Sequence, residues 1–536
     1  MTESFVSRPS RRTVLQSSAA GVALLAAGPQ AFAADETPKR GGILTFAIAA
    51  EPPTYDLHGS STFAVLQRVA PHYSTLLRYK GGAYPEIVGD LAESWQSAPD
   101  GLTHTFKLRA NVPFHDGTIM SSADVKASYE RIRNPPKGVV SSRQASLSKI
   151  AAIETPDPQT IVFKMSAVAS SFIDEACASP WNIIYSAARL EKDPAFPIRN
   201  IMGTGPFEFV EHVAGSHWVG KRFDKYFRQG YPLLDGFRAI TMSPAATVNA
   251  LVGKQILAEF RGFSPAERDR ITKGMGPAAK VQEGGWLLHQ DISFNPKRKP
   301  FDDPRVRRAL SLAIDRWGAS RSLGRISVLR DVGGVVMPGG QWAATEAELE
   351  KLPGFGRDMA ANRAEARRLL KEAGAENLKI QLLNRAIEPY ITAGIYLIDQ
   401  WRQIGVTVEN HDVETATWYA SISGDNFDVV MDSYTDYTDD PTTGLPKFLS
   451  ADKWPIASSK FNDPELDALY AKQGEANDKA ERRKLVRAFE ARTMEQAYSV
   501  PILWWRRITV MQDSVKGWTM SPSHMLYQDL GEVWLA

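Results

Sequence analysis

The segment Tyr434–Pro441 gathers acidic and aromatic side chains that could recognise a ligand. Asp436 lies there between Tyr434 and Tyr437. Burying a carboxylate without a cation is costly, so we expect Asp436, if it faces a cleft, to meet a positive group on a ligand or a nearby arginine. The following Asp439-Asp440-Pro441 is interpreted as a turn and helix cap, because Asp before Pro favours turn initiation. We predict no metal site there.

Arg385 and four aromatic residues are the further candidates for ligand binding. Arg385 ends the predicted strand Leu382–Arg385, and its planar guanidinium can clamp a ligand carboxylate through two parallel hydrogen bonds. A surface salt bridge is the alternative interpretation. Aromatic side chains could stack on or enclose an organic ligand, since such pockets are largely aromatic with a few polar anchors. These aromatics, each with core packing as its alternative, are Tyr434, Tyr437, Trp418 and Trp505.

The chain lacks the sequence signatures of catalysis and of metal binding. It has no G-x-S-x-G elbow, no H-E-x-x-H, no C-x-x-C and no G-x-x-x-x-G-K-[ST] loop, which would indicate hydrolase, zinc, redox or nucleotide chemistry. Its nine histidines show no ligand spacing. We therefore predict a protein that is not an enzyme and that uses neither a cofactor nor a metal.

The composition is that of an ordinary globular protein, with 43% hydrophobic, 10% aromatic and 23% charged residues among 536. The formal charge of +2 arises in residues 1–33; the rest of the chain holds 60 basic and 60 acidic residues. A neutral chain offers no footprint for nucleic acid. Cys177 is the sole cysteine, so no intramolecular disulfide can form, and we interpret it as a core residue.

The N-terminus has the three parts of an export signal. The flank Ser10–Gln16 carries the Arg11-Arg12 pair, and the apolar stretch Ala19–Ala27 and the exit Ala31–Ala33 follow. The arginine pair resembles the twin-arginine signal, which implies export in the folded state by that machinery; a general secretory leader is the alternative. No cysteine follows the expected cut after Ala33, and no later apolar run is long enough to span a bilayer. We therefore expect a soluble periplasmic protein without a lipid anchor.

Alternation of apolar and polar residues predicts several strands interleaved with helices. The predicted strands are Ile43–Ala49, Leu102–Arg109, Val406–Val408 and Val500–Met511. One helix starts at Ser121, where Ser121 and Asp124 can form a capping box, and a charged helical pair covers 463–497. The chain therefore has the pattern of an α/β protein.

Two further helices are predicted from their apolar faces. The first begins at Asp303-Pro304, and we expect its three arginines to lie in water: Arg305, Arg307 and Arg308. The second ends at Gly405 in a left-handed turn. Its apolar face is made of Ile391, Ile395, Ile398 and Trp401.

A series of short motifs runs through residues 40–536. They are Gly89–Trp95, Pro99–Thr103, Phe106–Arg109, Phe114–Gly117, Gly203–Phe207, Pro232–Gly236, Phe294–Asn295, Asp303–Arg307, Ala309–Asp315, Ser499–Ile502 and Val515–Gly517. In this order they resemble the bacterial extracellular solute-binding proteins of family 5, which include the oligopeptide and dipeptide receptors of ABC importers. The resemblance implies a periplasmic protein that captures a peptide or similar small organic solute for the permease subunits in the inner membrane, and that acts as a monomer.

The resemblance also implies the architecture and further site residues. The fold would be a two-lobed α/β periplasmic binding protein, with lobe I at 35–75, 203–285 and 503–536, an extra subdomain at 76–202 and lobe II at 286–502. A strand hinge would let the lobes close over the ligand. In the peptide receptors an aspartate near Pro441 pairs with the ligand's amino group; here that position is Tyr437, and Asp436 lies one residue earlier. Tyr55 and His58 would face the cleft.

Other functions stay open at this point, because fold does not fix ligand. A receptor of the same fold could take an opine, a sugar, a metal chelate or haem. An exported enzyme, a secretory chaperone and a sensor subunit are more distant alternatives.

Overall fold

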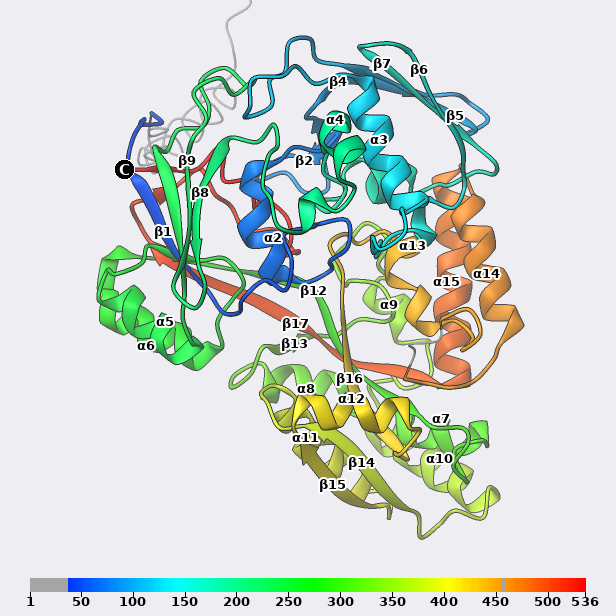
Figure 1. Ribbon diagram of the computed structural model, residues 1–536. Coiled ribbons are helices and arrows are strands. Elements are labelled where there is room, and N and C mark those ends of the chain that lie inside the picture. The colour runs from blue at the N-terminus through cyan, green and yellow to red at the C-terminus, as the bar shows by residue number, and fades with distance from the viewer. Residues whose placement is uncertain (1–36, 455–457) are drawn as a thin grey trace, which may run out of the picture. The chain divides into compact units, whose positions relative to one another are not determined.

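The computed structural model describes residues 37–454 and 458–536, so the predicted leader at 1–33 lies outside the described residues. The unit from Arg40 to Ala536 carries most of its described strands in three sheets (Figure 1). Within the described residues no helix is both long and apolar enough to cross a membrane. The other described strands form two short two-stranded sheets. These are β2 Leu77–Tyr79 with β3 Ile87–Gly89, and β18 Val515–Lys516 with β19 Trp534–Leu535.

The first sheet has the described order β11-β1-β10-β9-β8. Its strands are β1 Ile43–Ile48, β8 Phe207–Val213, β9 His217–Arg222, β10 Gly236–Thr241 and β11 Ala258–Glu259. Leu44, Phe46 and Ile48 are buried in one hydrophobic cluster, and Ala47 packs in another, as the alternation predicts. The neighbouring helices are α2 Phe63–Val69, α5 Pro244–Val252 and α6 Pro265–Met275.

The second sheet is antiparallel, has the described order β4-β5-β7-β6 and lies wholly within the range predicted for the extra subdomain. Its elements are β4 Ala92–Ser97, β5 Thr103–Leu108, β6 Ile150–Asp157, β7 Thr160–Met165, α3 Ser122–Arg133 and α4 Ala187–Lys192. The predicted capping box is confirmed: the Ser121 N–H donates to Asp124 Oδ2 at 2.8 Å. Cys177 is fully buried in the core of this part, which confirms its interpretation.

The third sheet has the described order β13-β17-β12-β16-β14-β15 and is dominated by two long strands (Figure 1). Its strands are β12 Ala279–Phe294, β13 Leu329–Asp331, β14 Lys379–Arg385, β15 Thr407–Val413, β16 Val429–Thr435 and β17 Ser499–Gln512. β12 and β17 pair antiparallel from Ala279 opposite Gln512 to Ser293 opposite Ser499. Their outer ends reach the first sheet, where the Gln512 N–H donates to the Leu257 carbonyl at 2.8 Å. Both strands cross the predicted boundaries between the lobes. These boundaries remain a prediction.

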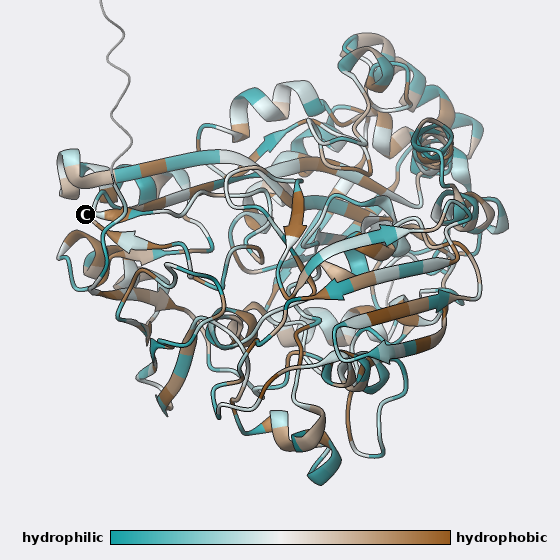
Figure 2. Cartoon of the chain, turned by 90° about the horizontal axis from the view of Figure 1, so that it is seen from above, coloured by the Kyte–Doolittle hydropathy of each residue, from teal (hydrophilic) through white to brown (hydrophobic). Residues whose placement is uncertain are grey.

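Helices of the third sheet form two groups. One hydrophobic cluster holds α7 Pro304–Leu312, α8 Arg316–Leu323, α10 Met359–Glu372 and α11 Tyr390–Arg402. Other clusters hold α9 Glu346–Leu349, α12 Thr415–Ser423, α13 Pro441–Gly444, α14 Pro464–Glu475 and α15 Lys479–Gln496. In Figure 2, hydrophobic residues in brown follow the inner strands, whereas the outer helices carry long teal stretches.

Two sequence expectations about helix faces are wrong. Arg307 is buried instead of lying in water, because its guanidinium donates to the carbonyls of Gln496, Phe301 and Asp302. Ile395 is 62% exposed, because α11 buries the face that contains Ala393, Leu397 and Trp401 instead.

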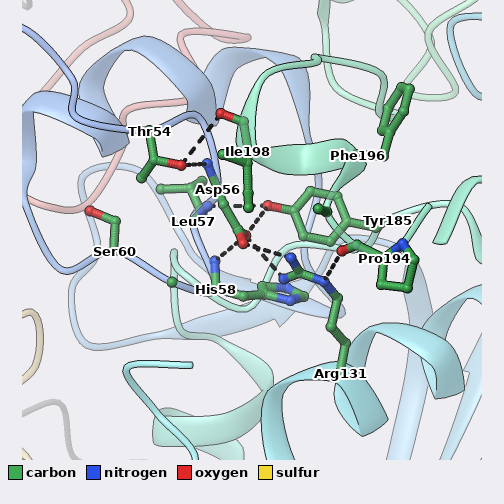
Figure 3. Close-up of polar contacts among 12 residues, drawn as sticks. Thr54, Asp56, Leu57, His58, Ser60, Arg131, Tyr185, Pro194, Phe196 and Ile198 are labelled. Atoms are coloured by element: carbon green, nitrogen blue, oxygen red, sulfur yellow. Dashed lines mark hydrogen bonds and ion pairs between the residues drawn. The ribbon is translucent and has the colours of Figure 1, made fainter. Parts of the chain in front are cut away.

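A buried ion pair joins the segment after β1 to the helix α3 of the second sheet (Figure 3). Arg131 donates to both carboxylate oxygens of Asp56, at 3.1 and 2.7 Å. Asp56 also accepts from the Tyr185 hydroxyl at 3.0 Å and from the His58 N–H at 3.0 Å. Burial raises the pKa of Asp56, but hydrogen bonds from Arg131 and Tyr185 outweigh it and hold that pKa below its ordinary value.

We expect Asp56→Asn to lower the free energy of unfolding by about 3–5 kcal/mol, because it leaves Arg131 buried without a counter-charge. Since pairing lowers the pKa of Asp56, this contribution is present above the ordinary carboxylate pKa and lost as the pH falls through the lower folded value. Urea denaturation at several pH values measures both effects. Asp302→Asn, which removes an exposed ion pair with Lys299, is the control and should cost less than about 1 kcal/mol.

Candidate functional site

A small cavity lies where β12, β16 and β17 meet the start of α13. Two of the predicted residues, Tyr434 and Asp436, line it together with Lys447, His289 and Trp504. The alternation of the strands explains this arrangement, because Tyr434 stands opposite His289, and His289 opposite Trp504, in the sheet register. The His289 and Trp504 rings stack with centroids 4.3 Å apart. These side chains form the aromatic wall of the cavity.

Asp436 is a carboxylate without an ion-pair partner among the described residues. Its Oδ1 accepts from the Tyr437 N–H at 2.8 Å, and its own N–H donates to the Leu287 carbonyl at 3.1 Å. Burial raises the pKa of Asp436 to about 6, and the charge of Lys447 is the cationic influence that opposes the rise. The positive group beside Asp436 is therefore Lys447 and not Arg385, the arginine that sequence analysis suggested.

Lys447 is the cation of the cavity and has no carboxylate within ion-pair distance among the described residues. Its Nζ makes a short contact with Nε2 of His289, and Nδ1 of His289 lies 3.0 Å from Oδ1 of Asp291. The ammonium lies 4.7 Å from the centre of the Tyr434 ring, a cation–π distance. Burial lowers the pKa of Lys447 to about 8, although the charges of Asp291 and Asp436 oppose the shift.

The neighbouring aspartates are structural, as sequence analysis interpreted them. Asp440 caps α13, since its Oδ1 accepts from the Thr442 N–H at 2.8 Å, and it forms a buried two-bond ion pair with Arg482. Asp439 accepts from the Tyr84 hydroxyl at 2.6 Å. Among the described residues no cluster of histidine, cysteine and acidic side chains could hold a metal ion.

Beside the cavity, β16 has an edge without a strand partner in the described chain. β16 pairs with β12 along its whole length, but with β14 only at Val429 and Val430. Arg385 lies at the end of β14, next to this open edge. Its guanidinium donates to the Tyr390 hydroxyl at 3.2 Å, and that hydroxyl lies 2.5 Å from Oγ of Ser433 on β16. Arg385 forms no ion pair with a described carboxylate. The alternative interpretation of Arg385 as half of a surface salt bridge is therefore wrong.

Three further predicted residues, all aromatic, do not line the cavity. Trp418 is buried and donates to the Met431 carbonyl at 3.2 Å, with Arg385 5.5 Å from its ring. Trp505 packs against Trp286 with ring centroids 5.7 Å apart. Tyr437 is buried and donates to the Glu175 carbonyl at 3.2 Å.

Tyr55 and His58 do not line the cavity. The Tyr55 hydroxyl lies 2.7 Å from Nδ1 of His212, and its ring packs on Trp218. His58 is fully buried, with Nε2 2.9 Å from the Ile183 carbonyl. Both therefore have structural contacts in this structure, and their roles toward a ligand stay predictions.

Sequence reasoning missed Lys447 and His289. Lys447 stands in Pro446-Lys447-Phe448, and nothing in its spacing distinguishes it from the other lysines. His289 lies inside a strand pattern, where a single histidine reads as a core residue. The alternation of β12 could have identified the face it shares with Asp291, but the pairing with β16 is a tertiary feature.

The chain is similar to known binding proteins over most of its length. The model of the family described as bacterial extracellular solute-binding proteins, family 5, middle, matches residues 86–455. The glutathione-binding protein GsiB of Escherichia coli K12 is 26% identical over 457 residues, 82% of this chain and 85% of that protein. The structure of AgaA with agropinic acid, from A. tumefaciens R10, has a TM-score of 0.75 at 28% identity, covering 92% of this chain and 99% of its own.

A peptide complex has the same fold. The ABC transporter-associated periplasmic binding protein DppA of Helicobacter pylori, in complex with the peptide STSA, has a TM-score of 0.76 at 22% identity over 93% of this chain and 98% of that one. The predicted two-lobed α/β fold is therefore confirmed.

Replacing Lys447 tests the electrostatics of the cavity. Burial lowers the pKa of Lys447 to about 8 from an ordinary 10.5. Between pH 8 and 10.5 the unfolded state therefore binds more protons than the folded state, so the charged Lys447 lowers the free energy of unfolding, most of all below pH 8. We expect Lys447→Met to raise the free energy of unfolding at pH 7 by roughly 1–3 kcal/mol, a gain that falls below about 1 kcal/mol by pH 10. Denaturant titrations at both pH values measure it. The exposed Lys453→Met should give no gain, and an equal gain at both pH values would contradict the assignment.

Proposed function

Because the chain belongs to the bacterial extracellular solute-binding proteins of family 5, we propose that it is the soluble receptor of an ABC importer for a small amino-acid conjugate, such as a short peptide or an opine. The receptor captures this ligand between its lobes and delivers it to the permease. GsiB and AgaA support the ligand class, since they bind glutathione and agropinic acid respectively. The receptor uses no cofactor and performs no turnover.

The observation that carries the proposal is the opposite charge of Asp436 and Lys447 in one cavity. Neither forms an ion pair with a described residue, although both are deprived of water. The ammonium of an α-amino-acid group would pair with Asp436, and its carboxylate with Lys447. Such a zwitterion satisfies two charges that are otherwise costly to bury.

The open edge of β16 supports a ligand with a peptide-like backbone. An extended chain can add to such an edge through main-chain hydrogen bonds, while the cavity receives one end. From Ser433 to Asp436 the strand advances by about 10 Å, at roughly 3.3 Å per residue. A conjugate of about two or three residues spans this distance.

We expect a thermal-shift panel of dipeptides, tripeptides, glutathione, opines, sugars and metal chelates to find a stabiliser among the amino-acid conjugates.

The affinity for this ligand should depend on pH in a bell shape. Affinity should rise as the pH increases through about 6, because Asp436 loses its proton, and fall above about 8, because Lys447 loses its charge. Calorimetry across pH 5–9 measures this.

Asp436→Asn is the variant that tests the amine contact. It should weaken binding by roughly 10-fold or more, since hydrogen bonds to charged groups contribute about 1.5–3 kcal/mol, and remove the lower limb of the profile. Asp302→Asn, at an exposed residue paired with Lys299 outside the cavity, is the control and should leave binding unchanged. A best ligand that is a sugar or a metal chelate would reject the amino-acid class and keep the receptor function.

We also propose export of the folded monomer to the periplasm by the twin-arginine machinery, supported by Arg11-Arg12 and the apolar stretch that follows. Replacing both arginines by lysine should retain the protein in the cytoplasm, as cell fractionation measures. Normal export of this variant would favour the general secretory route. Light scattering of the mature protein checks the monomeric state.

A further inference from the structure

The loop between β16 and α13, residues 436–440, carries Asp436. We call it the recognition loop. Its last four residues are buried, although loops usually run over the surface because buried backbone polar groups need hydrogen-bond partners. The partners of this loop must therefore come from other segments of the fold.

The β2–β3 hairpin, residues 77–89, supplies partners for the middle of the recognition loop. The Tyr84 hydroxyl donates to Oδ1 of Asp439 at 2.6 Å and accepts from the Asp439 N–H at 2.8 Å. The Tyr79 hydroxyl lies 3.1 Å from Oγ1 of Thr438. The two tyrosine rings pack on each other with centroids 5.3 Å apart. The hairpin thus contacts both the backbone and the side chains of the loop.

Tyr437 links this contact to the carboxylate of Asp436. Its N–H donates to Oδ1 of Asp436 at 2.8 Å, and its hydroxyl donates to the Glu175 carbonyl at 3.2 Å. On the other side, the Asp436 N–H donates to the Leu287 carbonyl at 3.1 Å. Because Asp439 lies only two residues after Tyr437, a shift of the backbone at Asp439 moves the Tyr437 N–H and changes the orientation of the Asp436 carboxylate.

The far end of the recognition loop is fixed by separate contacts. The Ser170 N–H and hydroxyl donate to the carbonyls of Gly474 and Gln473, at 3.1 and 3.2 Å. Oε1 of Gln473 accepts from Nε of Arg482 at 3.0 Å, and Arg482 forms the two-bond ion pair with Asp440. Removal of a hairpin hydroxyl therefore leaves both ends of the loop attached.

We propose that Tyr84 is a positioning residue that, together with Tyr79, fixes the recognition loop so that the carboxylate of Asp436 meets the ammonium of the ligand. The inference rests on the proposed function, in which Asp436 binds that ammonium, and it gives the β2–β3 hairpin a role in ligand specificity. Neither tyrosine lines the cavity, so both act through the loop.

A looser recognition loop should change the titration of Asp436. Burial is the main cause that raises the pKa of Asp436 to about 6. The charged groups that interact with it are Lys447, Asp440 and Glu175, and Tyr84→Phe leaves all three in place. Water that enters the loosened loop lowers the pKa of Asp436 toward its ordinary value, so that the carboxylate stays ionised at lower pH.

Amide hydrogen exchange tests the positioning without a ligand. Tyr84→Phe removes the hydroxyl and keeps the ring that packs on Tyr79. We expect the amides of the recognition loop to exchange roughly 10-fold faster, because the N–H and Oδ1 of Asp439 lose their partner, while the amides of β16 keep their rates. Tyr79→Phe is the second variant and should act in the same direction. Tyr396→Phe, which removes a hydroxyl bonded to the Asp315 carbonyl, is the matched control and should leave the loop unchanged.

Calorimetry tests the consequence for binding, with glutathione and alanyl-alanine each measured against its N-acetylated form. The unaltered protein should bind the free amine roughly 10-fold or more tightly than the acetylated compound. In Tyr84→Phe this ratio should fall to about 1–3, and the lower limb of the pH profile should move below about pH 6. Tyr396→Phe should keep both, because a loss of stability alone moves neither the ratio nor the limb.

The outcomes separate the positioning role from the proposed function. An unchanged exchange rate of the recognition loop, or an unchanged amine preference in Tyr84→Phe, overturns the positioning role and leaves the proposed receptor in place. If no amino-acid conjugate binds even the unaltered protein, the proposed function falls and this inference falls with it. Circular dichroism checks that each variant is folded; should Tyr84→Phe unfold, the same measurements on Tyr79→Phe decide.

Discussion

The antiparallel ladder between β12 and β17 is the constraint on which the rest of the structure depends. Both strands belong to the third sheet, and their outer ends reach the first sheet, where Gln512 binds the Leu257 carbonyl. The register shifts between Gly285 and His289, and an irregularity of this kind bends a strand locally. His289 and Trp504 face the cavity on one side of the ladder, while Arg507 fixes the loops that carry Arg261 and His524 on the other. This ladder thus positions two of the aromatic rings that line the cavity.

Much of the fold could be predicted because its determinants are local. The capping box at Ser121, the strand Val500–Met511 and the left-handed Gly405 each depend on a few adjacent residues, and the short motifs indicated the family that the comparison confirms. The sequence predictions were wrong where contacts with other parts of the fold determine which side chains are buried. Arg307 is buried because carbonyls from other segments surround it, and α11 turns its Ala393 face to the core because of the sheet it covers.

The candidate site was predictable only in part, for the same reason. Tyr434 and Asp436 lie in the cavity, and an acidic segment after a strand is a visible signal. Their cation, Lys447, comes from beyond α13, and its place beside Asp436 depends on how that short helix folds back. Charges that tertiary folding brings into one cavity leave no recognisable spacing in the sequence, so only the structure reveals them.

The single thiol has a practical consequence. Cys177 is fully buried, and burial raises its pKa well above the ordinary value, so the reactive thiolate is scarce and shielded. A maleimide fluorophore would therefore attach selectively to any cysteine engineered on the surface. Dyes placed on the two lobes in this way would show by energy transfer whether the lobes of single molecules open and close, without first removing the native cysteine.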